Sequence, residues 1–171
     1  MKFLFVGGGT LGPVMPLMAV SRALRKMQPH ASFAWIGTPT GPEGPIIRRE
    51  GIEFFALPVA KLDHFISWRW LTFPFDWARA RHAAARLIDE IRPDVVVAAG
   101  GYTAIPVVLA AAKRGIPCAT HQLDVELVRT NEWIAKHCES VTTSFAYEHA
   151  PFGDRVHDTR IATPVIIADS P

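Results

Sequence analysis

Two glycine-rich turns follow apolar runs of the sequence, and both have the composition of anion-binding loops. The first, Gly7-Gly8-Gly9-Thr10-Leu11-Gly12, matches G-x-G-x-x-G and stands between a strand-like run and a helix-like run. Glycine lets the backbone turn sharply and approach a ligand closely, and the free N–H groups of a helix N-terminus attract an anion. The loop therefore favours phosphate or diphosphate binding over a tight turn that binds no ligand.

A second turn, Gly100-Gly101-Tyr102, follows the apolar run at 94–98, and the polar segment 120–124 follows a third such run. Ligands of open parallel sheets bind outside the carboxyl ends of the strands. Three polar loops at one edge of one sheet therefore predict a shared site, in which Thr10 and Tyr102 would donate hydrogen bonds to a diphosphate.

Three further polar side chains are expected at this edge, and two of them could act on a hydroxyl of a bound ligand. His121 could position or deprotonate the hydroxyl, since a histidine titrates near neutral pH, and Asp124 could do so instead or orient the histidine. The alternatives are a structural hydrogen bond for His121 and an N-cap role for Asp124, ahead of a helix that begins at Val125. Asn131, one or two turns into that helix, faces either the site or solvent.

The elements that must position these residues alternate between strand-like and helix-like runs along the 171 residues. Short apolar runs predict strands at Lys2–Val6, Ser32–Ile36, Glu53–Leu57, Asp94–Ala98, Ile116–Thr120 and Ser140–Ser144. Helical spacing predicts helices at Val14–Met27, around Ile46–Arg49, and at Asp76–Ile91, Ala104–Arg114 and Val125–His137. The alternation indicates an α/β fold: a single Rossmann-like domain whose mainly parallel sheet has helices on both faces.

The composition argues against several classes of protein. Hydrophobic residues make up 49% of the chain, which argues against disorder, and a net charge of +2 is too small to indicate nucleic acid as a partner. The uncharged stretch 95–112 is interrupted by Gly100, Gly101 and Pro106, so no membrane span is expected. Cys118 and Cys138 are expected to be reduced thiols. The histidines are scattered, and neither a metal site nor a cofactor is predicted.

A dinucleotide-dependent oxidoreductase is the obvious alternative for a G-x-G-x-x-G loop. Such enzymes carry an acidic residue at the end of the second strand, where it binds the ribose hydroxyls. Here that position reads Trp35-Ile36-Gly37-Thr38, with neither a carboxylate nor a basic residue. An NAD(P)-binding oxidoreductase is therefore the least favoured function.

The segment 64–77 combines aromatic and basic residues. The residues expected to face a membrane are Phe65, Trp68, Arg69, Trp70 and Phe73. Large rings beside arginines favour the headgroup layer of a bilayer, and Pro74 makes the segment lie on the membrane instead of crossing it. An anionic membrane surface is thus a predicted partner. The alternative is that these rings pack in the core or against a neighbouring domain.

Motifs spread over almost the whole chain resemble the MurG family of UDP-N-acetylglucosamine transferases. In the family's order, the matching pieces are Gly8-Gly9-Thr10 with Gly12 and Val14, Trp35-Ile36-Gly37-Thr38, Pro93-Asp94-Val95-Val96, Gly100-Gly101-Tyr102, Gly115-Ile116-Pro117, His121, Thr130-Asn131 with Trp133, and Pro164-Val165. In that family a first nucleotide-fold domain binds a lipid-linked acceptor and a second binds the sugar nucleotide. The resemblance implies that residues 1–161 form the acceptor-binding domain and that residues 162–171 begin the interdomain linker.

The resemblance further implies a hexosyltransferase that works at the cytoplasmic face of the cell membrane. It would move a hexosamine, expected to be GlcNAc, from a UDP-sugar to a sugar linked to polyprenyl diphosphate, with the UDP-sugar bound by a donor domain outside this chain. The residues implied in binding the acceptor and its diphosphate are Gly8, Gly9, Thr10, Gly12, Gly100, Gly101, Tyr102 and Asn131.

Four positions depart from the family pattern. Pro13 replaces the histidine of the first loop, and Ile105 replaces the later glycine of the second. Gln122 stands for a glutamate, and Ile166 stands for the arginine that follows the linker's Pro-Val. These differences keep a second function open, a catalytically inactive module that recruits a partner to the membrane.

Overall fold

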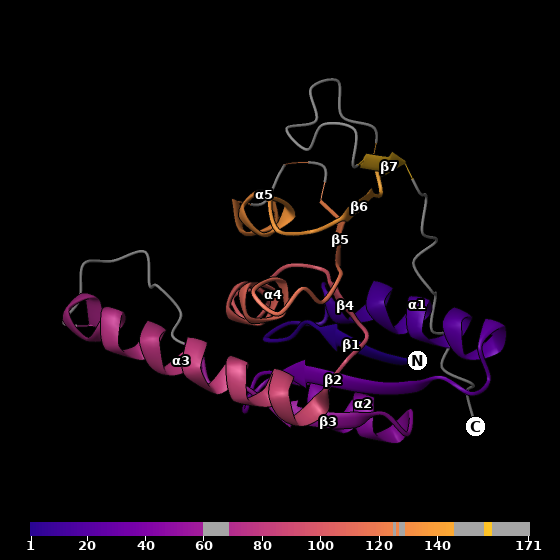
Figure 1. Ribbon diagram of the computed structural model, residues 1–171, viewed down its shortest axis with the longest axis horizontal. Helices are drawn as coiled ribbons and strands as arrows, with labels where there is room; N and C mark the ends of the chain where they lie inside the picture. The colour runs from indigo at the N-terminus through magenta and orange to yellow at the C-terminus, as the bar shows by residue number, and fades with distance from the viewer. Residues whose placement is uncertain (60–68, 125, 127–128, 146–155, 159–171) are drawn as a thin grey trace.

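One parallel sheet organises the chain in the computed structural model, which describes residues 1–59, 69–124, 126, 129–145 and 156–158 (Figure 1). The strands are β1 (Lys2–Val6), β2 (Ser32–Gly37), β3 (Glu53–Ala56), β4 (Val95–Ala98), β5 (Cys118–Gln122), β6 (Ser140–Thr143) and β7 (Val156–Asp158). The helices are α1 (Val14–Met27), α2 (Glu43–Arg49), α3 (Arg69–Ile91), α4 (Ala104–Ala112) and α5 (Arg129–Ala135).

The strand order is β3-β2-β1-β4-β5-β6-β7, and each described pairing is parallel. The chain runs outward from β1 to β3 and then returns to β4 on the other side of β1. At this reversal β1 leads into α1 on one face of the sheet and β4 leads into α4 on the other, an arrangement that leaves a crevice at the carboxyl edge. The predicted α/β fold with a mainly parallel sheet is confirmed.

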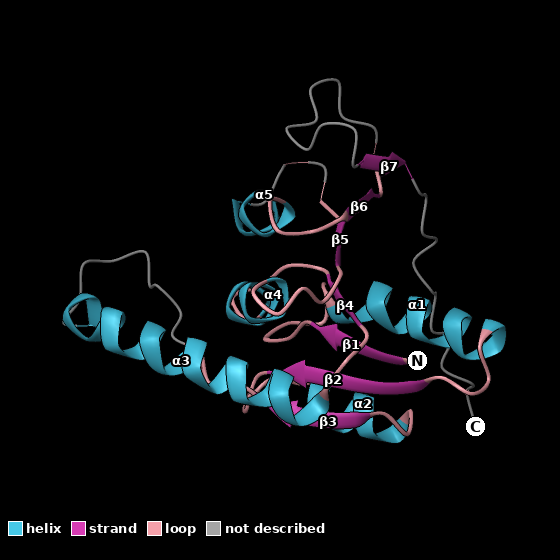
Figure 2. Cartoon of the chain, in the orientation of Figure 1, coloured by secondary structure: helices cyan, strands magenta, loops and turns pink. Residues whose placement is uncertain are grey.

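Helices cover both faces of the sheet (Figure 2). Alternate residues of β1 point to opposite faces, as the pleat requires. Leu4 and Val6 join the core beneath α3, α4 and α5, whereas Phe3 and Phe5 join the core beneath α1 and α2. Trp35 is buried in this second core. Its indole Nε1 donates a hydrogen bond of 2.8 Å to the carbonyl of Gly7, at the start of the first glycine turn.

The structure corrects two of the expected elements and adds a third that was not expected. α3 begins at Arg69, seven residues before the expected start, and contains Pro74. α5 begins at Arg129, so Asp124 lies outside the helix and the N-cap interpretation is wrong. The short strand β7 was not expected. None of the helices in the described ranges is long and apolar enough to cross a bilayer.

Candidate functional site

The two glycine turns lie against each other at the carboxyl edge of the sheet. Gly9, Gly100 and Gly101 have φ values of 85°, 88° and 85°, a region that residues with a Cβ rarely enter. A Cβ built on Gly101 would lie 3.6 Å from the carbonyl oxygen of Gly8. The turns therefore share one rim of the sheet, as the expectation of a joint site requires.

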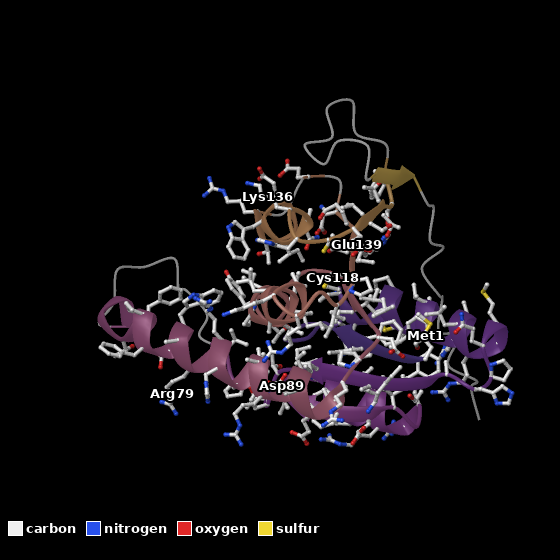
Figure 3. The ribbon with its side chains drawn as sticks, in the orientation of Figure 1. Met1, Arg79, Asp89, Cys118, Lys136 and Glu139 are labelled. Atoms are coloured by element: carbon white, nitrogen blue, oxygen red, sulfur yellow. The ribbon has the colours of Figure 1, made fainter. Side chains whose placement is uncertain are left out.

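A cleft of about 750 Å³ opens beside these turns. Its walls include Gly8 and Gly9 of the first turn, the loop 38–42, and Asp76 and Arg79 of α3. Figure 3 labels Arg79 on this helix. Sequence reasoning assigned Arg69 of this helix to a membrane face and did not single out Asp76.

Thr103 is the polar residue of the cleft that most clearly lacks a partner. It precedes the first turn of α4, its side chain is 1% exposed, and its Oγ1 has no hydrogen-bond partner among the described residues. A buried hydroxyl without a partner costs free energy. A ligand oxygen in the cleft would remove that cost, and the positive end of the α4 dipole lies beside the same point.

A buried carboxylate, Glu43, holds the first turn in place. Its Oε1 accepts hydrogen bonds from the amide of Gly9 at 3.1 Å, the amide of Thr38 at 2.6 Å and the hydroxyl of Thr38 at 2.7 Å. Burial acts to raise the pKa of this carboxyl, but the hydrogen bonds from Thr38 and Gly9 outweigh burial and hold the pKa below its ordinary value. The amide of Gly9 is thus already bound to an anion of the chain itself.

Three glycines surround this carboxylate. A Cβ on Gly8 or Gly41 would overlap Glu43, and a Cβ on Gly37 would lie 2.9 Å from its Oε1. These glycines, and not only the turn geometry, make room for the side chain. Sequence reasoning missed Glu43, although an unusual density of glycine before a single carboxylate was visible in the 37–44 segment. Glu43 is fully buried, so it is not positioned to bind ribose hydroxyls as an oxidoreductase would require.

His121 is 3% exposed, and each of its ring nitrogens lies within hydrogen-bond distance of a hydroxyl. Nδ1 lies 2.8 Å from Oγ1 of Thr142, and Nε2 lies 3.0 Å from Oγ of Ser144. Burial lowers the pKa of the imidazole and favours its neutral form. This placement supports the structural alternative for His121, and its action on a hydroxyl stays a prediction. Asp124, two residues beyond the end of β5, is exposed.

Asn131 lies behind the second glycine turn. It is 2% exposed, and its Nδ2 donates hydrogen bonds to Oε1 of Gln122 and, at 3.5 Å, to the carbonyl of His121. Its Oδ1 is buried without a partner in the described part of the chain, and a Cβ on Gly100 would overlap it. The side chain thus packs under the turn, a position compatible with supporting the site from behind.

The other residues predicted for the site are spread around it. Tyr102 lines the cleft and is 39% exposed. Thr10 and Gly12 are exposed on the first turn. Phe65 and Trp68 lie outside the described residues, while Arg69 and Trp70 belong to the first turn of α3. Phe73 is half-buried and stacks on Trp77, with ring centroids 6.4 Å apart and an interplanar angle of 14°.

A doubly wound parallel sheet with a polar cleft at its reversal point defines the nucleotide-fold class of domain. Within that class, residues 3–143 match the N-terminal domain of glycosyltransferase family 28. The chain belongs to this family, and the resemblance to MurG proteins read from its motifs is confirmed.

Relatives and solved structures agree with this assignment. The chain is 35% identical over 153 residues to the UDP-N-acetylglucosamine–N-acetylmuramyl-(pentapeptide) pyrophosphoryl-undecaprenol N-acetylglucosamine transferase of Bacillus cytotoxicus, a match that covers 88% of this chain and 42% of the relative. The crystal structure of Acinetobacter baumannii MurG aligns with a TM-score of 0.77 at 26% identity, over 99% of this chain and 47% of that one.

A more distant likeness shows the fold alone. The UDP-GlcNAc 2-epimerase of Neisseria meningitidis aligns with a TM-score of 0.59 at 15% identity, over 84% of this chain and 40% of that one. The chain therefore spans less than half the length of each of these proteins.

Proposed function

We propose that this chain is the acceptor-binding half of a glycosyltransferase that moves N-acetylglucosamine from UDP-GlcNAc to a sugar carried on a polyprenyl diphosphate. The names of the relatives describe this reaction for the whole proteins. The observation that carries the proposal for this half is the polar cleft, whose lining includes Arg79 and, at the α4 N-terminus, Thr103 with its buried and unpartnered hydroxyl.

The two turns would divide the acceptor between them. The diphosphate would bind at the second turn, where Thr103 and Tyr102 offer hydroxyls and the α4 dipole is positive. The first turn has the ionised Glu43 behind it, which disfavours a second anion there. Its glycine backbone would instead let the uncharged sugar approach closely, and Asp76 is the cleft carboxylate able to accept a proton from the attacking hydroxyl.

Transfer reconstituted with the natural donor domain tests this function. The chain and donor domain would be mixed with labelled UDP-GlcNAc and a polyprenyl-diphosphate-linked sugar. We expect label in the lipid product, and we expect Thr103→Val and Arg79→Gln to raise KM for the acceptor several-fold while KM for UDP-GlcNAc stays the same. Arg49→Gln, which changes an exposed arginine of α2 outside the cleft lining, is the matched control.

The same reconstitution separates the transferase from the inactive module. Transfer of label supports the enzyme. A complex that assembles tightly and transfers nothing to any polyprenyl-linked acceptor would leave the recruitment module as the function. Asp76→Asn should lower kcat with little change in KM, and an unchanged kcat would remove its proposed role.

A peripheral position at the cytoplasmic membrane face is the second part of the proposal. A groove on α3 and α4 carries Arg81, His82 and Lys113, and Phe75 of α3 is 73% exposed. Cations, together with an exposed ring on the same helix, suit anionic headgroups. Flotation with phosphatidylglycerol vesicles should exceed flotation with phosphatidylcholine vesicles and weaken in high salt. Flotation unchanged by Arg81→Gln with Lys113→Gln would refute the proposed face.

A further inference from the structure

A second, apolar groove of about 350 Å³ lies next to the polar cleft. Phe73 and Trp77 of α3, Ile105 of α4 and Trp133 of α5 line it, together with Tyr102 of the second turn. Figure 1 shows α4 between α3 and α5 on one side of the sheet, so the groove is built from three neighbouring helices.

The groove exposes aromatic rings that are held in fixed orientations. Trp133 is 40% exposed and meets His137 edge to face, with ring centroids 5.5 Å apart. Phe73 supports Trp77 by stacking. Rings that stay exposed in a cluster, instead of folding into the core, mark a binding surface.

The position of the groove identifies its occupant. Val59 and Tyr102 line both the groove and the polar cleft, so the two hollows adjoin each other. Arg129 lies on the groove and Arg79 on the cleft, and both charges are positive. A ligand with an anionic head near Arg79 and an apolar tail along the aromatic side chains would fit both hollows at once.

We propose that this groove binds the isoprenoid chain next to the diphosphate of the acceptor. The inference rests on the proposed function, because it takes the diphosphate to lie in the adjoining cleft. Branched isoprene units offer methyl groups to the faces of Trp77 and Trp133, and their burial removes apolar surface from water. The groove thereby distinguishes a lipid-linked acceptor from a free sugar phosphate of the same head.

Calorimetric titration of the whole chain with inorganic pyrophosphate, geranyl diphosphate and farnesyl diphosphate tests the tail site. Affinity should rise with the length of the prenyl chain. Trp133→Ala should weaken farnesyl diphosphate binding about 30-fold, which corresponds to ~2 kcal/mol, and leave pyrophosphate binding unchanged. Phe75→Ala removes an exposed ring that does not line the groove, and it should leave both affinities unchanged.

The outcomes separate this inference from the proposed function. Equal affinity for pyrophosphate and farnesyl diphosphate would overturn the tail site and leave the diphosphate cleft standing. Failure of pyrophosphate and all prenyl diphosphates to bind would overturn both. If Trp133→Ala abolished vesicle flotation or assembly with the donor domain without affecting farnesyl diphosphate, the groove would be a membrane or domain contact and the inference would be wrong.

Discussion

Replacing Glu43 by glutamine should destabilise the domain, although the two side chains have nearly the same shape. The amide oxygen of the substituted side chain could still accept from Gly9 and Thr38, but these bonds would lose their charge assistance. The new amide N–H group would replace Oε2, which is buried and has no hydrogen-bond partner in the described residues. An unsatisfied buried donor costs about 1–3 kcal/mol, and weaker bonds add about 1 kcal/mol, for a total of about 2–4 kcal/mol.

Urea denaturation at pH 7.5, with wild type and Glu43→Gln compared at constant m-value, measures this loss. Glu50→Gln is the control, since Glu50 forms a partly exposed ion pair with Arg22 and should cost no more than about 1 kcal/mol. A Glu43→Gln protein within about 0.5 kcal/mol of wild type would refute the reasoning, because it would mean that the charge contributes nothing to the turn.

The pH dependence gives a second check with a definite sign. The folded pKa of Glu43 lies below its unfolded value, so its contribution is complete above the unfolded pKa and is lost as the pH falls through the folded pKa. The difference in free energy of unfolding between wild type and Glu43→Gln should therefore become smaller below about pH 4. A gap that widens in acid would contradict an ionised Glu43.

Three other predictions concern single residues. Gly100→Ala should lower the free energy of unfolding by at least about 2 kcal/mol, because strain at positive φ adds to overlap with Asn131. The Cβ of Gly115→Ala would meet nothing within 4 Å, so strain alone should cost about 1 kcal/mol. Equal losses of stability in urea titrations of the two variants would contradict this reasoning. Burial raises the pKa of Cys118 to about 12, so iodoacetamide at pH 8 should label it only on unfolding, and rapid labelling in native protein, located by mass spectrometry, would contradict that burial. Because burial lowers the pKa of His121, wild type should lose urea stability relative to His121→Asn as the pH falls from 7 to 5, and parallel profiles would contradict a neutral buried ring.

The sequence predicted the sheet well because a buried parallel strand is indicated by consecutive apolar residues. Continuous apolar runs such as 3–6 and 95–98 can be buried on both faces, and glycine marks where the first ends. The start of α3 was missed because Pro74 was read as a break, whereas packing of residues such as Ala84 and Ile88 stabilises the helix that contains it. The three-residue strand β7 has no apolar run that could have predicted it.

The site was only partly visible in the sequence because its key contacts join distant segments. Glycine spacing located both turns, since positive φ is a local requirement. The contact of Glu43 with Gly9 spans 34 residues, and no periodicity encodes it. Asn131 was assigned to either the site or solvent, but it lies beneath Gly100. The sequence could not show this position, because the orientation of the side chain depends on where α5 begins.

Two turns of similar composition therefore have different electrostatic surroundings. Both turns precede a helix N-terminus, but the first is tied to a carboxylate of the chain, while the second lies beside an unpartnered hydroxyl. The proposed acceptor would therefore bind in one orientation, with its diphosphate at the second turn and its sugar toward the first. Tyr102 borders both the polar cleft and the apolar groove, so the lipid chain would leave on the side away from the sugar. The orientation of the acceptor would thus follow from a single buried charge, Glu43, without a base being positioned by the first loop.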